Sequence, residues 1–193
     1  MKLIVVIGST RPGRVSERVA KWVAKEAANL PGTKVDLVDL KDYPMPLFDE
    51  PKSPRYNPER KPSVVVQKWM DKIAEGEAYV FVTPEYNHSI PGVLKNALDY
   101  ITVELTKKPA TVVSQGSVGG ARAIVHLKEV LSESGAAITP RQVALSAAAE
   151  KLNEEGELSE EVKAQPYGPA AALHSLLEEL RWYSDALSAA RAK

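Results

Sequence analysis

The feature that most narrows the possible folds is a buried strand, a helix and a second strand at the start of the chain. Residues 3–7 read LIVVI, a continuous run of aliphatic side chains. Such a run is typical of a strand buried on both faces of a parallel sheet. A helical spacing of apolar residues follows within 16–29, and residues 35–40 alternate as a second strand. A strand, a helix and a strand within about 40 residues form a βαβ unit, which closes right-handed onto a parallel sheet.

The same alternation continues along the rest of the chain. Strands are predicted at 78–83, at 111–114 and, more weakly, at 137–144, where Pro140 favours an edge position. Helices are predicted at 63–74, 92–103, 121–132 and over about 20 residues from Ala170. Alternating βα units predict a single α/β domain over residues 1–193 with a doubly wound, flavodoxin-like fold. We expect a five-stranded parallel sheet of order 2-1-3-4-5 in three α/β/α layers, with ligands bound beside strands 1 and 3.

Two segments break this pattern. Residues 41–62 contain six prolines, which predicts a long loop without regular structure. Leu47 and Phe48 would anchor it, as a flap or a subunit contact; a mobile surface loop is the alternative. Residues 151–163 are acidic and contain a glycine, so we expect an exposed excursion there.

Composition excludes several classes of function. The 25 basic and 25 acidic residues give a net charge of zero, so neither nucleic acid nor an anionic membrane is an expected partner. Without cysteine, the chain has no disulfide, thiolate metal site or thiol redox centre, and any redox function needs a bound cofactor. The apolar run at 3–7 is shorter than a signal-peptide core, and no run approaches a membrane span. We therefore expect a cytoplasmic protein.

The loop after the first strand, GSTRPGRVS at residues 8–16, is a candidate anion site. It opens a helix, so its backbone N–H groups and the helix dipole favour negative charge. The hydroxyls of Ser9, Thr10 and Ser16 and the guanidiniums of Arg11 and Arg14 add donors. Arginine suits a phosphate because its planar fork donates two hydrogen bonds. The loop predicts binding of a terminal phosphate, the alternative being a tight βα turn with surface arginines.

Two better-known phosphate motifs do not fit this loop. Gly8 and Gly13 have the P-loop spacing, but Arg14-Val15 replaces the Lys-Ser/Thr pair of that motif. The dinucleotide pattern fails because Thr10 stands at its second glycine. A nucleotide-binding kinase is therefore the least favoured alternative.

Two further loops follow the third and fourth strands. The first reads TPEYNHSIPG from residue 83, and its Tyr86 offers a flat face for a planar ring. The second reads SQGSVGGAR from residue 114, and its three glycines allow a ligand to approach the backbone closely. Phosphate donors, an aromatic loop and a glycine-rich loop at one crevice suit a phosphorylated planar heterocycle. Flavin mononucleotide (FMN) meets all three demands.

The segments GSTRPGR and PEYNHSIPGVLKNALDY resemble the NAD(P)H-dependent FMN reductase family, whose relatives include quinone, azo-dye and chromate reductases. The resemblance covers roughly residues 2–143, and the second segment is the more specific. It implies that the first loop holds the FMN phosphate, the second borders the ribityl chain and ring, and the third contacts the ring's polar edge. The implied contacts are Ser9, Thr10, Arg11, Arg14, Val15 and Ser16 in the first loop, Pro84, Glu85, Tyr86 and Asn87 in the second, and Ser114, Gly116, Ser117, Gly119 and Gly120 in the third.

The resemblance also implies an activity. NADH or NADPH would reduce FMN, and a small oxidant such as a quinone, a free flavin or an azo compound would then take the electrons at the same site in a ping-pong reaction. Homodimers or homotetramers are implied too. The alternative is a non-enzymatic FMN-binding electron carrier or redox sensor, although such carriers usually have a strong negative charge balance.

We assign no catalytic acid, base or nucleophile, because the flavin supplies the chemistry. His88 is interpreted as a loop histidine, and Glu85 as an exposed loop carboxylate. Ser117 lacks the leading glycine of the hydrolase motif G-x-S-x-G, and no metal-ligand spacing is present in the sequence. Candidates for the second phosphate of NADPH are Arg55, Arg60 and Arg122.

Overall fold

A parallel sheet forms the centre of the computed structural model, which describes residues 1–57 and 59–193. Its strands are β1 (Lys2–Ile7), β2 (Lys34–Asp39), β3 (Ala78–Pro84), β4 (Pro109–Gly116), β5 (Ala137–Ile138) and β6 (Val143–Ser146). The order is β2-β1-β3-β4-β5, with β6 also paired to β4, which confirms the predicted topology. Every residue of β3 and all of β1 after Lys2 are buried, as the apolar runs require.

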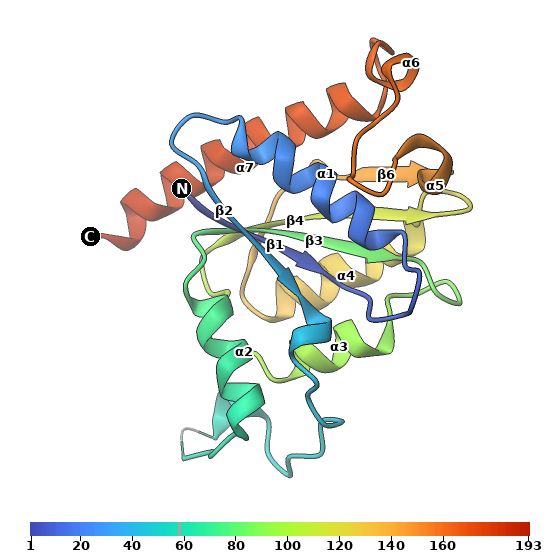
Figure 1. Cartoon of the computed structure of the whole chain (residues 1–193). Coiled ribbons are helices and arrows are strands. Elements are labelled where there is room, and N and C mark those ends of the chain that lie inside the picture. The colour runs from blue at the N-terminus through green and yellow to red at the C-terminus, as the bar shows by residue number, and fades with distance from the viewer. Residues whose placement is uncertain (58) are drawn as a thin grey trace.

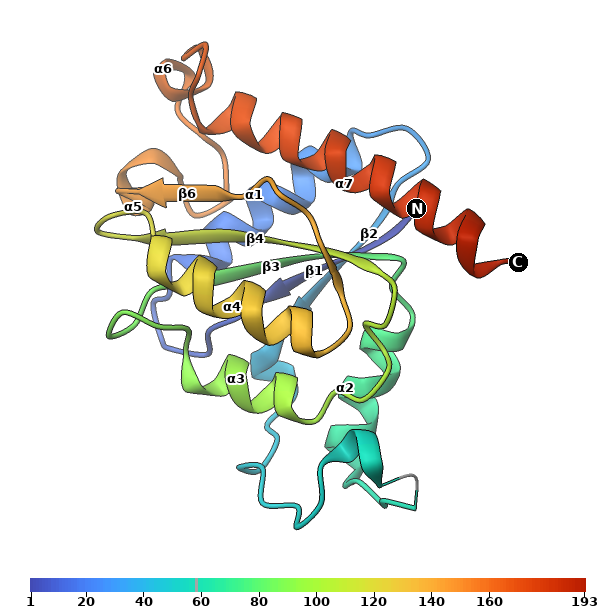
Figure 2. The same cartoon turned by 180° about the vertical axis from the view of Figure 1, so that it is seen from behind.

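Helices cover both faces of this sheet (Figures 1 and 2). The long helices are α1 (Ser16–Ala28), α2 (Val64–Ala74), α3 (Gly92–Asp99), α4 (Ala121–Glu133) and α7 (Pro169–Arg191), and the short ones are α5 (Ala148–Lys151) and α6 (Glu160–Lys163). One core cluster joins the sheet to α2, α3 and α4, and a second joins it to α1 and α7. Within the described residues, no helix is both long and apolar enough to span a membrane.

The predicted fifth strand is two strands rather than one. β5 and β6 both pair with β4 but are separated by residues 139–142, which include Pro140. There the Thr111 hydroxyl donates to the carbonyl of Arg141 at 2.7 Å, so a side-chain hydrogen bond replaces the ladder. Proline cannot donate to a ladder, which explains the break.

Residues 41–62 largely lack regular structure, as predicted, apart from the 3₁₀ turns η1 (Leu40–Asp42) and η2 (Pro54–Tyr56). Pro58 lies outside the described residues. Phe48 does anchor the segment, with its ring centroid 5.2 Å from that of Tyr100. Leu47 is 82% exposed in the single chain, so its predicted role in a flap or a subunit contact stays a prediction. Arg60 adds a second anchor through a bidentate pair with Glu50 at 3.0 and 2.6 Å.

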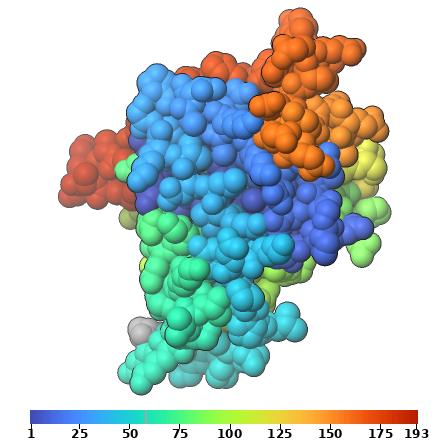
Figure 3. Space-filling view, in the orientation of Figure 1, coloured from blue at the N-terminus to red at the C-terminus, as the bar shows by residue number. Residues whose placement is uncertain are grey.

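Two element boundaries also differ from expectation. The helix predicted at 92–103 ends at Asp99, because the Glu104 carboxylate accepts the N–H groups of Thr102 and Val103 instead. The segment 151–163 is not simply exposed: Leu152, Leu158 and Val162 are buried in the core cluster beside α1. In Figure 3 this orange segment lies beside the blue surface of α1.

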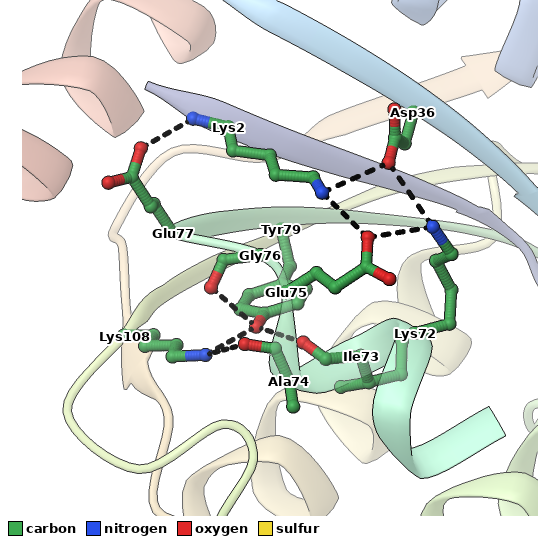
Figure 4. Close-up of polar contacts among 10 residues, drawn as sticks. All are labelled: Lys2, Asp36, Lys72, Ile73, Ala74, Glu75, Gly76, Glu77, Tyr79 and Lys108. Carbon is green, nitrogen blue, oxygen red and sulfur yellow. Dashed lines mark hydrogen bonds and ion pairs between the residues drawn. The ribbon is translucent and has the colours of Figure 1, made fainter. Parts of the chain in front are cut away.

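A charged network lies at the amino ends of β1 and β3 (Figure 4). Lys2 Nζ donates to Glu75 Oε2 at 2.6 Å, and Lys72 Nζ donates to the same oxygen at 2.8 Å. These hydrogen bonds, that from Lys2 first, lower the pKa of Glu75 to about 2. Beneath the network, the buried Tyr79 hydroxyl donates to the carbonyl of Ile73 at 2.6 Å. The network joins α2 to the sheet at the edge opposite the carboxyl ends.

Glu75 should make stability depend on pH in acid. Its pKa in the folded protein lies below the unfolded value near 4.5, so its contribution is present above about pH 4.5 and is lost as pH falls towards 2. Glu75→Gln should therefore lower the urea midpoint at pH 6, and the difference from the wild type should shrink towards pH 2 and at high salt. As a control, Glu129→Gln removes an exposed carboxylate of α4 with no ion pair among the described residues. The same pH-dependent difference for both variants would contradict the assignment.

Candidate functional site

Three loops meet at the carboxyl ends of the central strands, at one end of the sheet in Figure 1. They follow β1 (residues 8–15), β3 (85–91) and β4 (117–120). The parallel register places Ile7 beside Val82 and Thr83 beside Ser114, so the three strands end at similar heights. This edge contains the switch point between β1 and β3, where ligands of such sheets bind.

The loop after β1 begins with a close backbone approach. The N–H of Gly8 donates to the carbonyl of Val82 on β3 at 2.8 Å. Ser9 is buried, and its hydroxyl lies 2.9 Å from the hydroxyl of Tyr86 in the loop after β3. Thr10 and Val15 are half-buried and Arg11 is exposed, while the N–H of Arg11 donates to Ser9 Oγ at 3.4 Å. Ser9 and Tyr86 thus join the first two loops.

Arg14 differs from its predicted environment. Its side chain is only 6% exposed, and Nη1 donates to the carbonyl of Ser9 at 2.8 Å. Nη2 donates to Glu17 at 3.2 Å and also to Asp39 at the end of β2. The guanidinium therefore braces the loop from behind. Of its nitrogens only Nε, which is buried, lacks a hydrogen-bond partner in the described part of the chain.

Unused donors at the start of α1 are compatible with an anion. The Ser16 side chain is fully buried, yet its hydroxyl has no partner among the described residues. No side chain caps α1 in that same part of the structure, so its first N–H groups are not occupied by a capping oxygen. A phosphate oxygen at this helix end would satisfy such donors. The residues present therefore fit the phosphate of FMN.

The loop after β3 is a tight turn. Tyr86 and Ser89 exchange backbone hydrogen bonds of 2.9 and 3.0 Å, and the two residues between them, Asn87 and His88, have φ of +49° and +64°. Residues other than glycine rarely adopt a positive φ, so the backbone of this turn is constrained. Both side chains at these positions are exposed. Ser89 Oγ lies 3.0 Å from Nδ1 of His126 on α4, which braces the turn. Pro84, by contrast, is buried as the last residue of β3.

Glu85 connects the second loop to the third. Its N–H donates to the carbonyl of Gln115 at 3.0 Å, and its carboxylate accepts from the backbone N–H of Arg122 at 3.0 Å and from Arg122 Nε at 2.7 Å. Burial alone would raise the pKa of Glu85, but these hydrogen bonds and the Arg122 charge lower it overall. The expectation of an exposed carboxylate is wrong, because the side chain is 7% exposed.

The Gly-rich loop after β4 is shaped by its glycines. Gly119 and Gly120 both have φ of +79°, and a Cβ at Gly120 would lie 2.9 Å from Ser114 Oγ. Ser114 is fully buried and its hydroxyl donates to the carbonyl of Gly119 at 2.5 Å. Gly116 is half-buried and Ser117 is exposed. The hydroxyl of Ser114 therefore shapes the loop from inside.

Most of the sequence-predicted site residues lie in or under these three loops. The sequence did not indicate the partners that hold them: Asp39, Arg122 and the pair Ser89–His126. Only the position of Asp39 at the end of a predicted strand could have suggested its role. Of the suggested NADPH-phosphate residues, Arg60 is bound to Glu50 and Arg122 to Glu85.

Of two clefts, one borders this region and the other lies away from it. One of about 190 Å³ is lined by the first loop, α1, Lys41 and Glu154, and basic side chains outnumber carboxylates in it. Another of about 390 Å³ lies between η2 and the carboxyl-terminal halves of α3 and α4, at the far end of α4 from the Gly-rich loop. The first cleft borders the loop after β1, but its lining includes neither Ser16 nor a residue of the other two loops.

Known proteins resemble this chain over the region that contains the three loops. The family model described as NADPH-dependent FMN reductase matches residues 1–150. An NAD(P)H-dependent FMN reductase of Schizosaccharomyces pombe is 34% identical over 151 residues, covering 78% of this chain and 76% of the relative. A quinone reductase of Escherichia coli is 31% identical, covering 68% and 69%.

A solved structure extends the likeness of the fold to nearly the whole chain. FerB, an NAD(P)H:acceptor flavoenzyme of Paracoccus denitrificans, superimposes with a TM-score of 0.75 over 95% of this chain and 97% of its own, at 22% identity. At that identity the match concerns the fold alone. The family match over residues 1–150 includes all three loops. The chain therefore belongs to the NADPH-dependent FMN reductase family of oxidoreductases.

Proposed function

We propose that this protein binds FMN at the three loops and uses NAD(P)H to reduce a small oxidant such as a quinone, a free flavin or an azo compound. The observation that carries the proposal is the buried hydroxyl of Ser16, which has no partner among the described residues. It lies within the family-matched region, at a helix start that no described side chain caps. A buried hydroxyl without a partner is costly, which supports a ligand that satisfies it. We propose further that residues 1–193 form a single flavin-binding domain.

Each loop has a distinct role in this proposal. The loop of Ser9, Thr10, Arg11, Val15 and Ser16 binds the phosphate, and Arg14 holds that loop in shape through Ser9 and Asp39. The turn that contains Pro84, Glu85, Tyr86 and Asn87 borders the ribityl chain and the ring. The backbone of Gly116, Ser117, Gly119 and Gly120, supported by Ser114, donates to the polar edge of the ring.

The reaction needs little from the side chains themselves. Bound FMN would accept hydride from NAD(P)H and pass the electrons to the oxidant at the same place. The loops orient the cofactor and limit access of water to it. A shared site predicts ping-pong kinetics, and homodimers or homotetramers stay a prediction from the family resemblance.

The decisive measurement is a titration of the apoprotein with FMN and, in parallel, riboflavin, followed by flavin fluorescence. We expect FMN to bind tightly. Riboflavin lacks the phosphate and should bind with a dissociation constant higher by about tenfold or more. NAD(P)H oxidation is then measured with a quinone at varied concentrations of both substrates. Parallel lines in double-reciprocal plots would support the shared site.

Other outcomes separate the alternatives. Tight FMN binding without NAD(P)H turnover would favour an electron carrier or redox sensor. Intersecting lines would contradict the ping-pong reaction while leaving the flavin site intact. If neither flavin bound, the whole proposal would fall.

A further inference from the structure

The carboxylate of Glu85 occupies an unusual position for a loop residue. Oε2 accepts the backbone N–H of Arg122 at 3.0 Å and lies 3.5 Å from that of Ala123, while Oε1 accepts from the Arg122 guanidinium. Both backbone donors belong to the first turn of α4. Glu85 therefore acts as the amino-terminal cap of a helix from which it is 36 residues distant in sequence, counting to Ala121.

In the part of the chain that the structure describes, α4 has no local side-chain cap. Gly120 precedes it with φ of +79°, and no local side chain among the described residues accepts a hydrogen bond from its first turn. Helix starts leave about four N–H groups without intrahelical partners, and a carboxylate there also interacts favourably with the dipole. Among the described residues, the first turn of α4 therefore depends on an acceptor from the neighbouring loop, the Glu85 carboxylate.

The Gly-rich loop is held by the same residue. The main chain of Glu85 donates to Gln115 at one end of this loop, and its carboxylate binds Arg122 just after the other end. A Cβ at Gly116 would lie 3.4 Å from Cβ of Glu85, so the loop packs closely on it. Both ends of the loop are thus tied to a single residue of the loop after β3.

We propose that Glu85 is a positioning residue that caps α4 and holds the Gly-rich loop against the loop after β3 before flavin binds. The inference rests on the proposed function only where it concerns flavin. Its consequence is that the backbone N–H groups of the Gly-rich loop are preorganised, so less ordering accompanies binding. Glu85 acts through the loop and not as an acid or base.

The first test uses the apoprotein and does not depend on flavin. In Glu85→Gln the two backbone donors lose their charged acceptor. Amide hydrogen exchange at Arg122, Ala123 and residues 116–120 should speed up about tenfold or more, while exchange in β1 and β3 stays unchanged. Unchanged exchange at Arg122 and Ala123 would overturn the proposal even if the protein never bound a flavin.

The second test separates positioning from phosphate binding. Glu85→Gln should weaken the binding of FMN and of riboflavin by the same factor of about ten, because both flavins carry the same ring. The ratio of their affinities should therefore stay unchanged. It should also move the visible absorption of the bound flavin towards that of free flavin, a change that general destabilisation does not produce. Glu85→Asp, which keeps the charge on a shorter side chain, should recover part of both effects.

Two control variants sharpen the comparison. Arg122→Gln keeps both backbone donors for the Glu85 carboxylate, so exchange and flavin binding should stay within about threefold of the wild type. Glu129→Gln alters an exposed carboxylate on the same helix and should change nothing. If Arg122→Gln were as severe as Glu85→Gln, the ion pair and not the cap would hold the loop, and the proposal would be wrong.

Discussion

Gly8→Ala is expected to lower the free energy of unfolding by about 3 kcal/mol and to weaken flavin binding with it. A Cβ at this position would lie 2.7 Å from the carbonyl oxygen of Val82 and 2.9 Å from Cδ2 of Leu94. The carbonyl is backbone of the adjacent central strand and already accepts the Gly8 N–H at 2.8 Å. It cannot move without parting β1 from β3, so the methyl group must displace the start of the loop after β1. Urea unfolding and FMN titration measure the two effects.

Gly92→Ala is the matched control for this prediction. Gly92 starts α3 in a neighbouring loop, an added Cβ there meets nothing within 4 Å, and its φ is not positive. Stability should stay within about 0.5 kcal/mol or rise slightly. Equal losses in both variants would show that close approach of β1 and β3 at Gly8 is not the cause.

Ser16→Ala is expected to change stability and affinity in opposite directions. Removing a buried hydroxyl that has no partner in the described structure should stabilise the apoprotein by about 1 kcal/mol. Loss of a hydrogen bond to a charged phosphate should weaken FMN binding about tenfold to a hundredfold. Riboflavin affinity should not change, because riboflavin has no phosphate. Apoprotein melting and paired titrations of the two flavins measure all three quantities.

Ser132→Ala is the control, since Ser132 is exposed on α4. It should leave both flavin affinities and the melting temperature as in the wild type. A loss of riboflavin affinity in Ser16→Ala equal to the loss for FMN would mean that the residue does not bind the phosphate. Lower apoprotein stability would mean that its hydroxyl is satisfied within the protein.

The sequence predicted the central architecture because the signals there are local. β1 is a nearly uniform aliphatic run and β3 is a mostly apolar run with two aromatic residues, and the side chains of such strands are buried between two helical layers. The predictions were less accurate for elements with weaker sequence signals. β5 and β6 were merged across Pro140, and 151–163 was read as exposed, because burial of Leu152 and Leu158 depends on docking to α1.

The candidate site shows the same division. The three loops were found because parallel strands end at a common edge, whatever the details of packing. Their internal partners were not found, since each partner comes from a distant segment: Asp39 for Arg14, and Arg122 for Glu85. A guanidinium or carboxylate in a loop looks the same in the sequence whether it faces a ligand or a neighbouring loop.

The sequence by itself determined the order of strands, the two-sided burial of the sheet and the edge at which a ligand is expected to bind. These properties follow from the spacing of apolar residues and from the handedness of βαβ units, which act over short stretches of chain. Only the tertiary structure decided which polar groups are committed to the protein and which are left for a ligand. Arg14 and Glu85 are held by distant partners, whereas Ser16 is buried without one in the described part of the chain, because hydrogen bonding depends on distances across the fold rather than along the chain.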